Sequence, residues 1–212
     1  MTSQVAATPM FPLGSVLLPG SAIPLHVFEP RYRQMVYDVL AADGPPQFGQ
    51  VLITHGPETG GADQRADVGV LAEMTSIEAL EGGRYAFLAA GLARIRVRRW
   101  LEDDPYPRAE IEVWNDPAVV SDEEFAANAG RVHDRLHEVL ELARQVAPEV
   151  RVPERLDLPD DPSAASFVLT ALAPIGQSDR LALLSAEGPD ERLDRLAGAL
   201  EDVEAMLRFR LS

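Results

Sequence analysis

The pattern of apolar and polar positions changes once along this chain of 212 residues. Up to about Trp114, apolar residues alternate with polar ones in short runs bounded by glycine and proline, which indicates half-buried β-strands. Beyond Pro117, apolar residues recur at the spacing of amphipathic helices. The alternation predicts strands at residues 10–18, 23–28, 48–54, 68–77, 85–89, 92–101 and 108–114.

The stretch from Pro24 to Met35 predicts a strand that runs directly into a helix. Pro30 suits the first helical position, because its fixed φ is already helical and its missing N–H would have no intrahelical partner there. Asp43 and Gly44, followed by two prolines, predict the end of this helix. The positions expected to face the core are Met35, Val36, Val39 and Leu40.

Four helices are expected after Pro117. Ser121 with Glu124 is a capping box, and Asp161-Pro162, Ser178 and Pro189 predict three further helix starts. The expected core positions of the first helix are Phe125, Ala129, Val132, Leu136, Val139, Leu140 and Ala143. Those of the others are Phe167, Val168, Ala171 and Leu172, then Leu181 and Leu184, then Leu193, Leu196, Leu200, Val203 and Leu207.

These patterns predict an α+β protein. Residues 1–117 are expected to form a mostly antiparallel β subdomain that carries one helix. Residues 118–212 are expected to form a helical bundle. The chain is long enough to bury a core in each part.

Several short motifs resemble one known family when they are taken in order. Phe11-Pro-Leu and Leu17-Leu-Pro-Gly precede the strand and helix at residues 24–35. The strands at 68–74 and 91–97 resemble the family's GTxAEI and G-x-x-R-x-x-I strands, and residues 177–184 and 191–196 resemble its last helices. The set is similar to the Lon N-terminal (substrate-binding) domain family over nearly the whole chain.

The resemblance implies a PUA-like β pseudo-barrel, and a domain that engages proteins or exposed peptide segments and delivers them to a protease. Full Lon adds an ATPase module and a Ser–Lys protease module. A phosphate-binding P-loop and a Ser–Lys dyad both need lysine, and all 19 basic residues here are arginine. We therefore expect a stand-alone, non-catalytic member that lacks both modules.

The composition narrows the function further. A net charge of −15 argues against polyanionic partners such as nucleic acid. The absence of cysteine excludes disulfides, thiolate metal sites and a thiol nucleophile. The sequence contains no run of about 18 apolar residues, so it predicts no membrane span. The first residues lack the basic region of a secretory signal. We expect a cytoplasmic protein without a cofactor.

Aromatic residues are the candidate peptide-binding groups, because only 6% of the chain is aromatic. Large aromatics mainly lie in cores, and a core position is the alternative for each of them. An exposed subset would form an apolar surface for an extended or unfolded chain. The candidates are Phe28, Tyr32, Trp100, Tyr106 and Trp114.

Four arginines near residue 96 support an alternative function, which is RNA binding by a PUA-like protein. Arg94, Arg96, Arg98 and Arg99 lie on one predicted strand, opposite a strand that carries Glu110 and Glu112. A hairpin of these strands would instead pair the arginines with the glutamates on a solvated face. The acidic surroundings favour this second interpretation.

His133 and His137 have the spacing of a zinc-binding helix. Glu141 could add a third ligand, but both histidines flank the apolar stripe, and a zinc site needs three or four convergent ligands. A solvated helix edge is therefore the preferred interpretation. The chain contains neither a G-x-S-x-G nor a G-x-G-x-x-G motif, and we predict no catalytic, cofactor-binding or metal-binding residues.

The sequence thus predicts a binding module that is not an enzyme. It would recognise proteins or exposed peptide segments, as an adaptor for unfolded or degradation-bound proteins. We expect a monomer or a weak homodimer.

Overall fold

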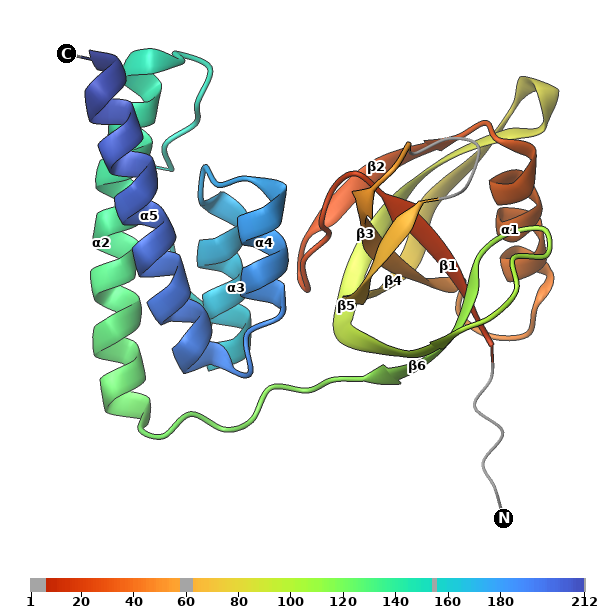
Figure 1. Ribbon diagram of the computed structural model, residues 1–212, viewed down its shortest axis with the longest axis horizontal. Coiled ribbons are helices and arrows are strands. Elements are labelled where there is room, and N and C mark those ends of the chain that lie inside the picture. Colours follow the sequence, from red (N-terminus) through yellow and green to blue (C-terminus); the bar gives the residue numbers. More distant parts are fainter. Residues whose placement is uncertain (1–6, 58–62, 154–155, 212) are drawn as a thin grey trace. The chain divides into compact units, whose positions relative to one another are not determined.

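The computed structural model describes residues 7–57, 63–153 and 156–211. It has six strands and five α-helices within these residues, and the α+β class is confirmed (Figure 1). The chain divides into two compact units, residues 1–115 and 116–212. Among the described residues, none of the helices combines the length and apolar character that crossing a membrane requires.

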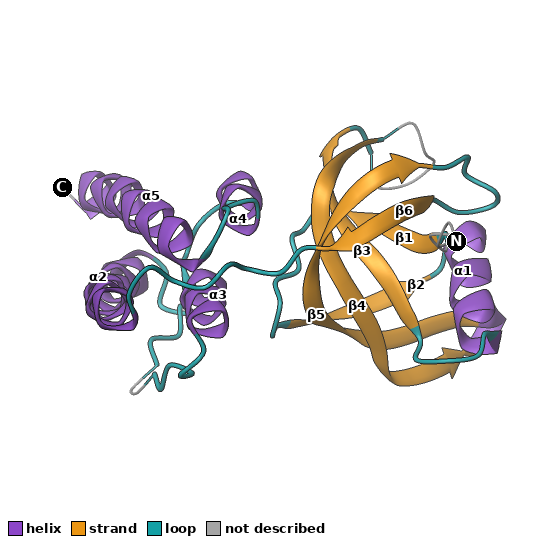
Figure 2. Cartoon of the chain, turned by 90° about the horizontal axis from the view of Figure 1, so that it is seen from below, coloured by secondary structure: helices purple, strands orange, loops and turns teal. Residues whose placement is uncertain are grey.

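All strands lie in the first unit and form one sheet (Figure 2). They are β1 (Thr8–Leu13), β2 (Ala22–Val27), β3 (Gln47–His55), β4 (Gln64–Leu80), β5 (Arg84–Trp100) and β6 (Arg108–Val113). Their order is β2-β5-β4-β3-β1-β6, and β6 also pairs with β5. Only β1 and β3 are parallel, so the sheet is mostly antiparallel, as predicted.

One long strand, β5, replaces the two strands predicted at residues 85–89 and 92–101. The backbone continues through Ala90 and Gly91 with a register shift against β4. A side chain at Gly91 would collide with the carbonyl oxygen of Leu18. This glycine therefore allows two backbones to approach closely and does not end a strand.

Helix α1 (Pro30–Ala41) follows β2, with Pro30 in the first turn as predicted. Tyr32, Met35, Val36 and Val39 are its buried residues. The prediction that Leu40 faces the core is wrong, because its side chain is 42% exposed. Leu40 lies about 100° around the helix from Val39, beyond the buried stripe.

Gln50 on β3 holds the connection between β1 and β2. Its side chain is buried, and its Oε1 accepts a hydrogen bond of 3.0 Å from the Leu17 N–H. Its Nε2 donates to the Ser15 carbonyl at 2.8 Å. Two backbone groups of the connecting loop are satisfied in this way, which fixes the path by which the chain enters β2.

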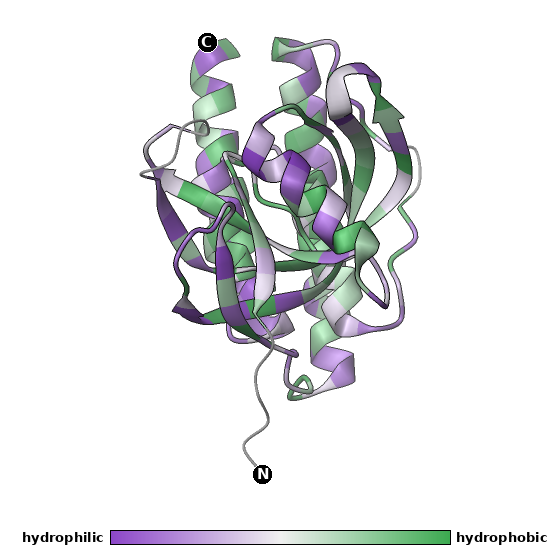
Figure 3. Ribbon diagram, turned by 90° about the vertical axis from the view of Figure 1, so that its right-hand side faces the viewer, coloured by the Kyte–Doolittle hydropathy of each residue, from purple (hydrophilic) through white to green (hydrophobic). Residues whose placement is uncertain are grey.

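Side-chain hydropathy follows the pleat of the sheet, with apolar and polar residues alternating along the strands (Figure 3). In β2, Ile23 and Leu25 are half-buried and Val27 is buried, while the residues between them are exposed. Strand β2 therefore buries one face, as its alternation predicts.

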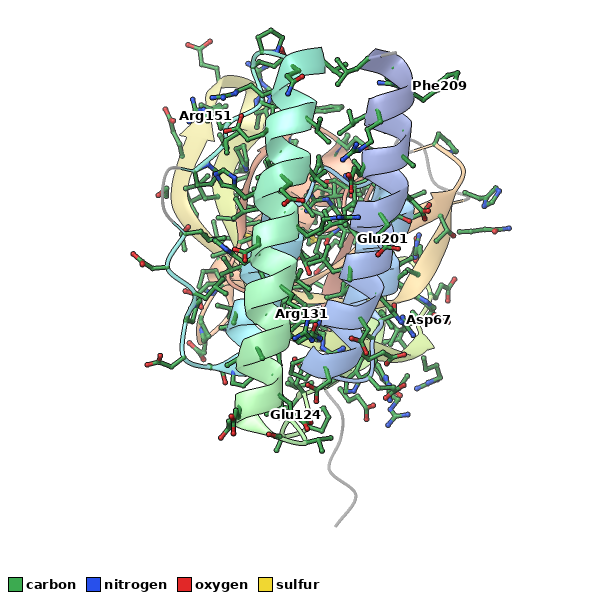
Figure 4. The ribbon with its side chains drawn as sticks, turned by 90° about the vertical axis from the view of Figure 1, so that its left-hand side faces the viewer. Asp67, Glu124, Arg131, Arg151, Glu201 and Phe209 are labelled. Carbon is green, nitrogen blue, oxygen red and sulfur yellow. The ribbon has the colours of Figure 1, made fainter. Side chains whose placement is uncertain are left out.

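The second unit contains α2 (Asp122–Val146), α3 (Pro162–Leu172), α4 (Gln177–Leu184) and α5 (Pro189–Leu211). Helices α2 and α5 run side by side (Figure 4). All seven predicted core positions of α2 are buried. The Ser121 hydroxyl accepts a hydrogen bond from the Glu124 N–H, and Asp161 caps α3 in the same way through the Ala164 N–H.

Two predictions for the shorter helices are wrong. Helix α4 is preceded by Gly176 at the cap position, so Ser178 lies inside the helix. In α3, Phe167 is buried and Leu172 packs against the core as predicted, but Val168 and Ala171 are only partly buried. The fully buried face of α3 consists of Ala165, Ser166, Phe167, Leu169 and Thr170.

The two hydroxyls on that face both have hydrogen-bond partners, and the Thr170 hydroxyl donates 2.8 Å to the Ser166 carbonyl. Arg192 of α5 is completely buried and donates 2.7 Å to the Ser166 hydroxyl. It also donates two hydrogen bonds, of 3.0 and 2.9 Å, to the carboxylate of Asp116. Its guanidinium lies 3.7 Å from the ring centre of Phe167. A paired charge of this kind, which periodicity does not reveal, fixes α3 and α5 relative to Asp116.

Candidate functional site

Strand β2 forms one end of the sheet. It pairs with β5 along its whole length, and no other described strand pairs with its second edge. The side chains of Ala22, Pro24 and His26 are exposed along it. We call the backbone groups of these three residues on the unpaired side the β2 edge. A row of unpaired N–H and C=O groups is a template for another extended chain.

A depression of about 120 Å³ lies at the end of the β2 edge. We call it the Phe28 hollow, and it is lined by Phe11, Pro12, Leu13, His26, Val27, Phe28, Glu29 and Tyr32. It thus lies between the end of β1 and the junction of β2 with α1. Most of these residues are apolar, so the hollow suits an apolar side chain.

Phe28 is the exposed member of the hollow. Its side chain is 56% exposed, because Val27 takes the buried position at the end of β2 and Pro30 already begins the helix. Covering an exposed aromatic ring with an apolar ligand group lowers the free energy of the complex, because apolar surface is removed from water.

Tyr32 forms the floor of the hollow. Its ring is buried and lies 4.2 Å from the Phe11 ring, centre to centre. Burial raises the pKa of Tyr32 to about 12, although the nearby Arg31 guanidinium opposes the shift. Arg31 lies over the ring at 4.5 Å and pairs with Glu29 at 3.2 Å. The Tyr32 phenol is therefore neutral at physiological pH and is held in place by contacts with Phe11 and Arg31.

The other three aromatic candidates are held by contacts within the unit. Tyr106 is buried and donates 3.0 Å to Asp38 on α1. Burial, reinforced by this hydrogen bond, raises the pKa of Tyr106 to about 12. Trp100 donates to Asp67 at 3.2 Å, and the guanidinium of Arg65 lies 5.0 Å from its ring centre.

Trp114 contacts two of the four arginines between residues 94 and 99. The guanidinium carbons of Arg94 and Arg96 lie 3.9 and 3.4 Å from its ring centre, and Arg94 is almost completely buried. These are close cation–π contacts. Trp114 therefore covers two of the four arginines that could otherwise have formed a basic surface.

The remaining two arginines of the run pair with glutamates across the hairpin. Arg98 forms an ion pair with Glu112, and Arg99 forms one with Glu110. The hydrogen bond from Arg99 holds the pKa of the Glu110 carboxyl below its usual range. The expected pairing with glutamates agrees with the contacts of Arg98 and Arg99. The expectation of a solvated face is wrong for Arg94, which is buried against Trp114.

His133 and His137 lie on α2, away from any cluster of ligands. His133 Nδ1 lies 3.2 Å from Asp134 Oδ1. Within the described residues, no three histidine, aspartate or glutamate side chains gather closely enough to hold a metal ion.

The sequence predicts two of the residues that line the hollow, Phe28 and Tyr32. It does not predict the β2 edge or the residues from β1 that line the hollow. Edge position depends on which strands pair, and periodicity alone does not reveal that pairing. One local signal exists, because proline within a strand is confined to sheet edges and bulges, and Pro24 lies in the middle of β2.

A family model for the ATP-dependent protease La (LON) substrate-binding domain matches residues 7–202. The chain belongs to this family. Lon proteases from Anaeromyxobacter dehalogenans (strain 2CP-C) and Trichlorobacter lovleyi are each 28% identical to it, over 97% and 94% of the chain. The chain spans only 22% and 24% of their lengths, and the family model describes the substrate-binding part of Lon.

Solved structures of Lon N-terminal domains are similar as well. The Lon N-terminal domain protein from Xanthomonas campestris has a TM-score of 0.63 and 27% identity, covering 92% of this chain and 98% of that one. The N-terminal domain of Mycobacterium avium complex Lon protease also has a TM-score of 0.63, at 20% identity, covering 93% of this chain and 99% of that chain. The second likeness concerns the fold alone.

Proposed function

We propose that this Lon-type substrate-binding domain recognises exposed, extended segments of unfolded proteins and acts as an adaptor for proteins bound for degradation. Binding takes place at the β2 edge and the Phe28 hollow. The observation that carries the proposal is the exposed Phe28 beside an apolar hollow at the end of an unpaired strand. The chemistry is recognition without catalysis.

The proposal includes two finer structural points. We take the sheet to be a PUA-like pseudo-barrel, which is supported by β6 pairing with both β1 and β5. We take helices α2 to α5 to be a bundle, which is supported by their shared core of leucine, valine and alanine.

The RNA-binding alternative has less support. Its four arginines contact Trp114, Glu110 or Glu112, and phosphate would have to compete with these partners. The net charge of −15 adds repulsion. No observation on the described residues favours this second candidate.

Fluorescence anisotropy tests the proposed function. A labelled, permanently unfolded polypeptide and its folded parent are each titrated with the purified protein. The expected result is saturable binding of the unfolded form alone. Equal binding of both forms, or binding of neither, would refute recognition of unfolded segments.

A further inference from the structure

We propose that the bound segment adds a strand to the β2 edge and places one large apolar side chain in the Phe28 hollow. This inference rests on the proposed function and specifies its binding mode. It requires a ligand with a free, extended backbone, and it requires that alternate backbone N–H groups of that ligand point at β2.

The hydrogen bonds at the start of β2 define which groups point outward. The Gly91 N–H donates 2.8 Å to the Ser21 carbonyl. Residues of an antiparallel ladder alternate between bonding to the neighbouring strand and pointing away from it. Counting from Ser21 along the register of β2 with β5, the backbone groups of Ile23, Leu25 and Val27 face β5.

The same alternation directs the backbone groups of Ala22, Pro24 and His26 away from β5. Pro24 supports this assignment independently, because proline has no N–H to donate and is tolerated in a strand where that position faces away from the ladder. The β2 edge thus offers a carbonyl at each of these residues, and N–H groups at Ala22 and His26 only.

An extended backbone is the partner that fits this row. Its own N–H and C=O groups alternate at the same spacing, whereas the backbone groups of a helix are already used within the helix. Folded proteins without a free strand edge would be excluded. Strand addition therefore gives a physical reason for a preference for unfolded segments.

The Phe28 hollow selects one side chain of the added strand. It lies where the β2 edge ends, between residues 11–13 and 26–29, and its volume of about 120 Å³ has room for a single large apolar group. The net charge of −15 favours lysine at the other positions of the ligand.

The test uses a labelled peptide of about nine residues that alternates valine with lysine and ends in phenylalanine. A series of peptides carries one N-methyl group each, at successive backbone nitrogens. N-methylation removes one N–H and adds a clash on that side of the strand, and it leaves the side chains unchanged. Affinity for the full chain is measured by anisotropy.

N-methylation at the alternate positions that face the carbonyls of Ala22, Pro24 and His26 is expected to weaken binding by about tenfold, since each of these groups loses a hydrogen bond and contact with β2. Methylation at the positions between them should change the affinity by less than about twofold, because those N–H groups point to solvent. All peptides of the series have the same side chains. An alternation in affinity along the series therefore reports only the direction in which each backbone N–H points.

The variant Pro24→Ala tests the protein side of the same contact. It introduces an N–H at an outward position of β2, which can donate to a carbonyl of the peptide. The unmethylated peptide should therefore bind about twofold to fivefold more tightly. Wild-type protein with the methylated peptides remains a complete test if this variant does not fold.

The outcomes separate the inference from the proposed function. Peptide binding that is insensitive to N-methylation at every position would overturn strand addition and leave recognition of unfolded segments standing. Failure of both this peptide and the unfolded polypeptide to bind would overturn both. Dimerisation that excludes the peptide, so that only the monomer binds it even at saturating peptide, would assign the β2 edge to a second copy of the chain and overturn the proposal.

Discussion

Phe28 is the residue on which the proposed binding site depends most. Replacing it with alanine should weaken binding of the unfolded polypeptide by about fivefold to tenfold, because covering the exposed half of its ring contributes roughly 1–1.4 kcal/mol. Anisotropy measures the change. Phe209→Ala is the matched control, since Phe209 is an 82% exposed phenylalanine on α5. Equal losses in the two variants would contradict a site at β2.

Two buried tyrosines predict how stability depends on pH. The pKa values of Tyr32 and Tyr106 are both raised to about 12, so the folded state holds protons that the unfolded state releases from about pH 10. Stability should be unaffected by these groups below pH 10 and should fall between about pH 10 and 12, by roughly 2 kcal/mol for each tyrosine.

Urea unfolding at pH 9 and near pH 11 measures this loss. Tyr106→Phe should show a smaller decrease than the wild type, because phenylalanine does not titrate. A wild-type midpoint that stays constant across this pH range would contradict burial of the two phenols.

Asp116 and Arg192 form a buried ion pair in the second unit, and their side chains are almost completely shielded from solvent. Asp116→Ala leaves the Arg192 guanidinium buried without its main counter-charge, so it should lower the free energy of unfolding by about 3–5 kcal/mol. Chemical unfolding measures the change. The control is Glu201→Ala, at an exposed position of α5, the helix that carries Arg192 (Figure 4). It should change the free energy of unfolding by less than about 0.5 kcal/mol.

At the residue scale, the sequence predicts which positions are buried better than it predicts which side chains contact one another. The core positions of α2 follow from spacing alone. The contact of Trp114 with Arg94 and Arg96 does not, because it depends on β6 pairing with β5 in one register. Arg192 is invisible to periodicity for the same reason, since its partners Asp116 and Ser166 are distant in sequence.

At the scale of elements, helix caps give a direct test of the corrected boundaries. Ser121→Ala removes the hydroxyl that accepts from the Glu124 N–H and should cost about 1 kcal/mol of stability. Ser178→Ala should cost much less, because Gly176 holds the cap position of α4. Thermal and urea unfolding of the two variants would contradict the assignment if Ser178→Ala proved the more damaging.

Strand β5 shows why element boundaries are harder to predict than element types. The pattern predicts two strands at residues 85–89 and 92–101, yet Gly91 permits the close approach of Leu18 and one strand continues through it. Strand β2 shows the converse case. Its alternation predicts one buried face, but its position at the end of the sheet depends on the other strands, so the β2 edge could not be predicted from the local pattern.

At the scale of the whole molecule, the charge of −15 should tune client choice. Lysine-rich unfolded polypeptides should bind more tightly than neutral ones at low ionic strength. This advantage should disappear near 1 M salt, where screening acts within about 3 Å. Anisotropy over a salt series measures it, with the neutral polypeptide as the control. An advantage that is independent of salt would contradict an electrostatic origin.

The most direct test of the central claim is a map of backbone amide signals by nuclear magnetic resonance while the unfolded polypeptide is added. The largest changes are expected at the amides of residues 22–28 and 11–13, apart from Pro12 and Pro24, which have no N–H. Changes concentrated on helices α2 to α5, or an unchanged spectrum at saturating polypeptide, would contradict the claim.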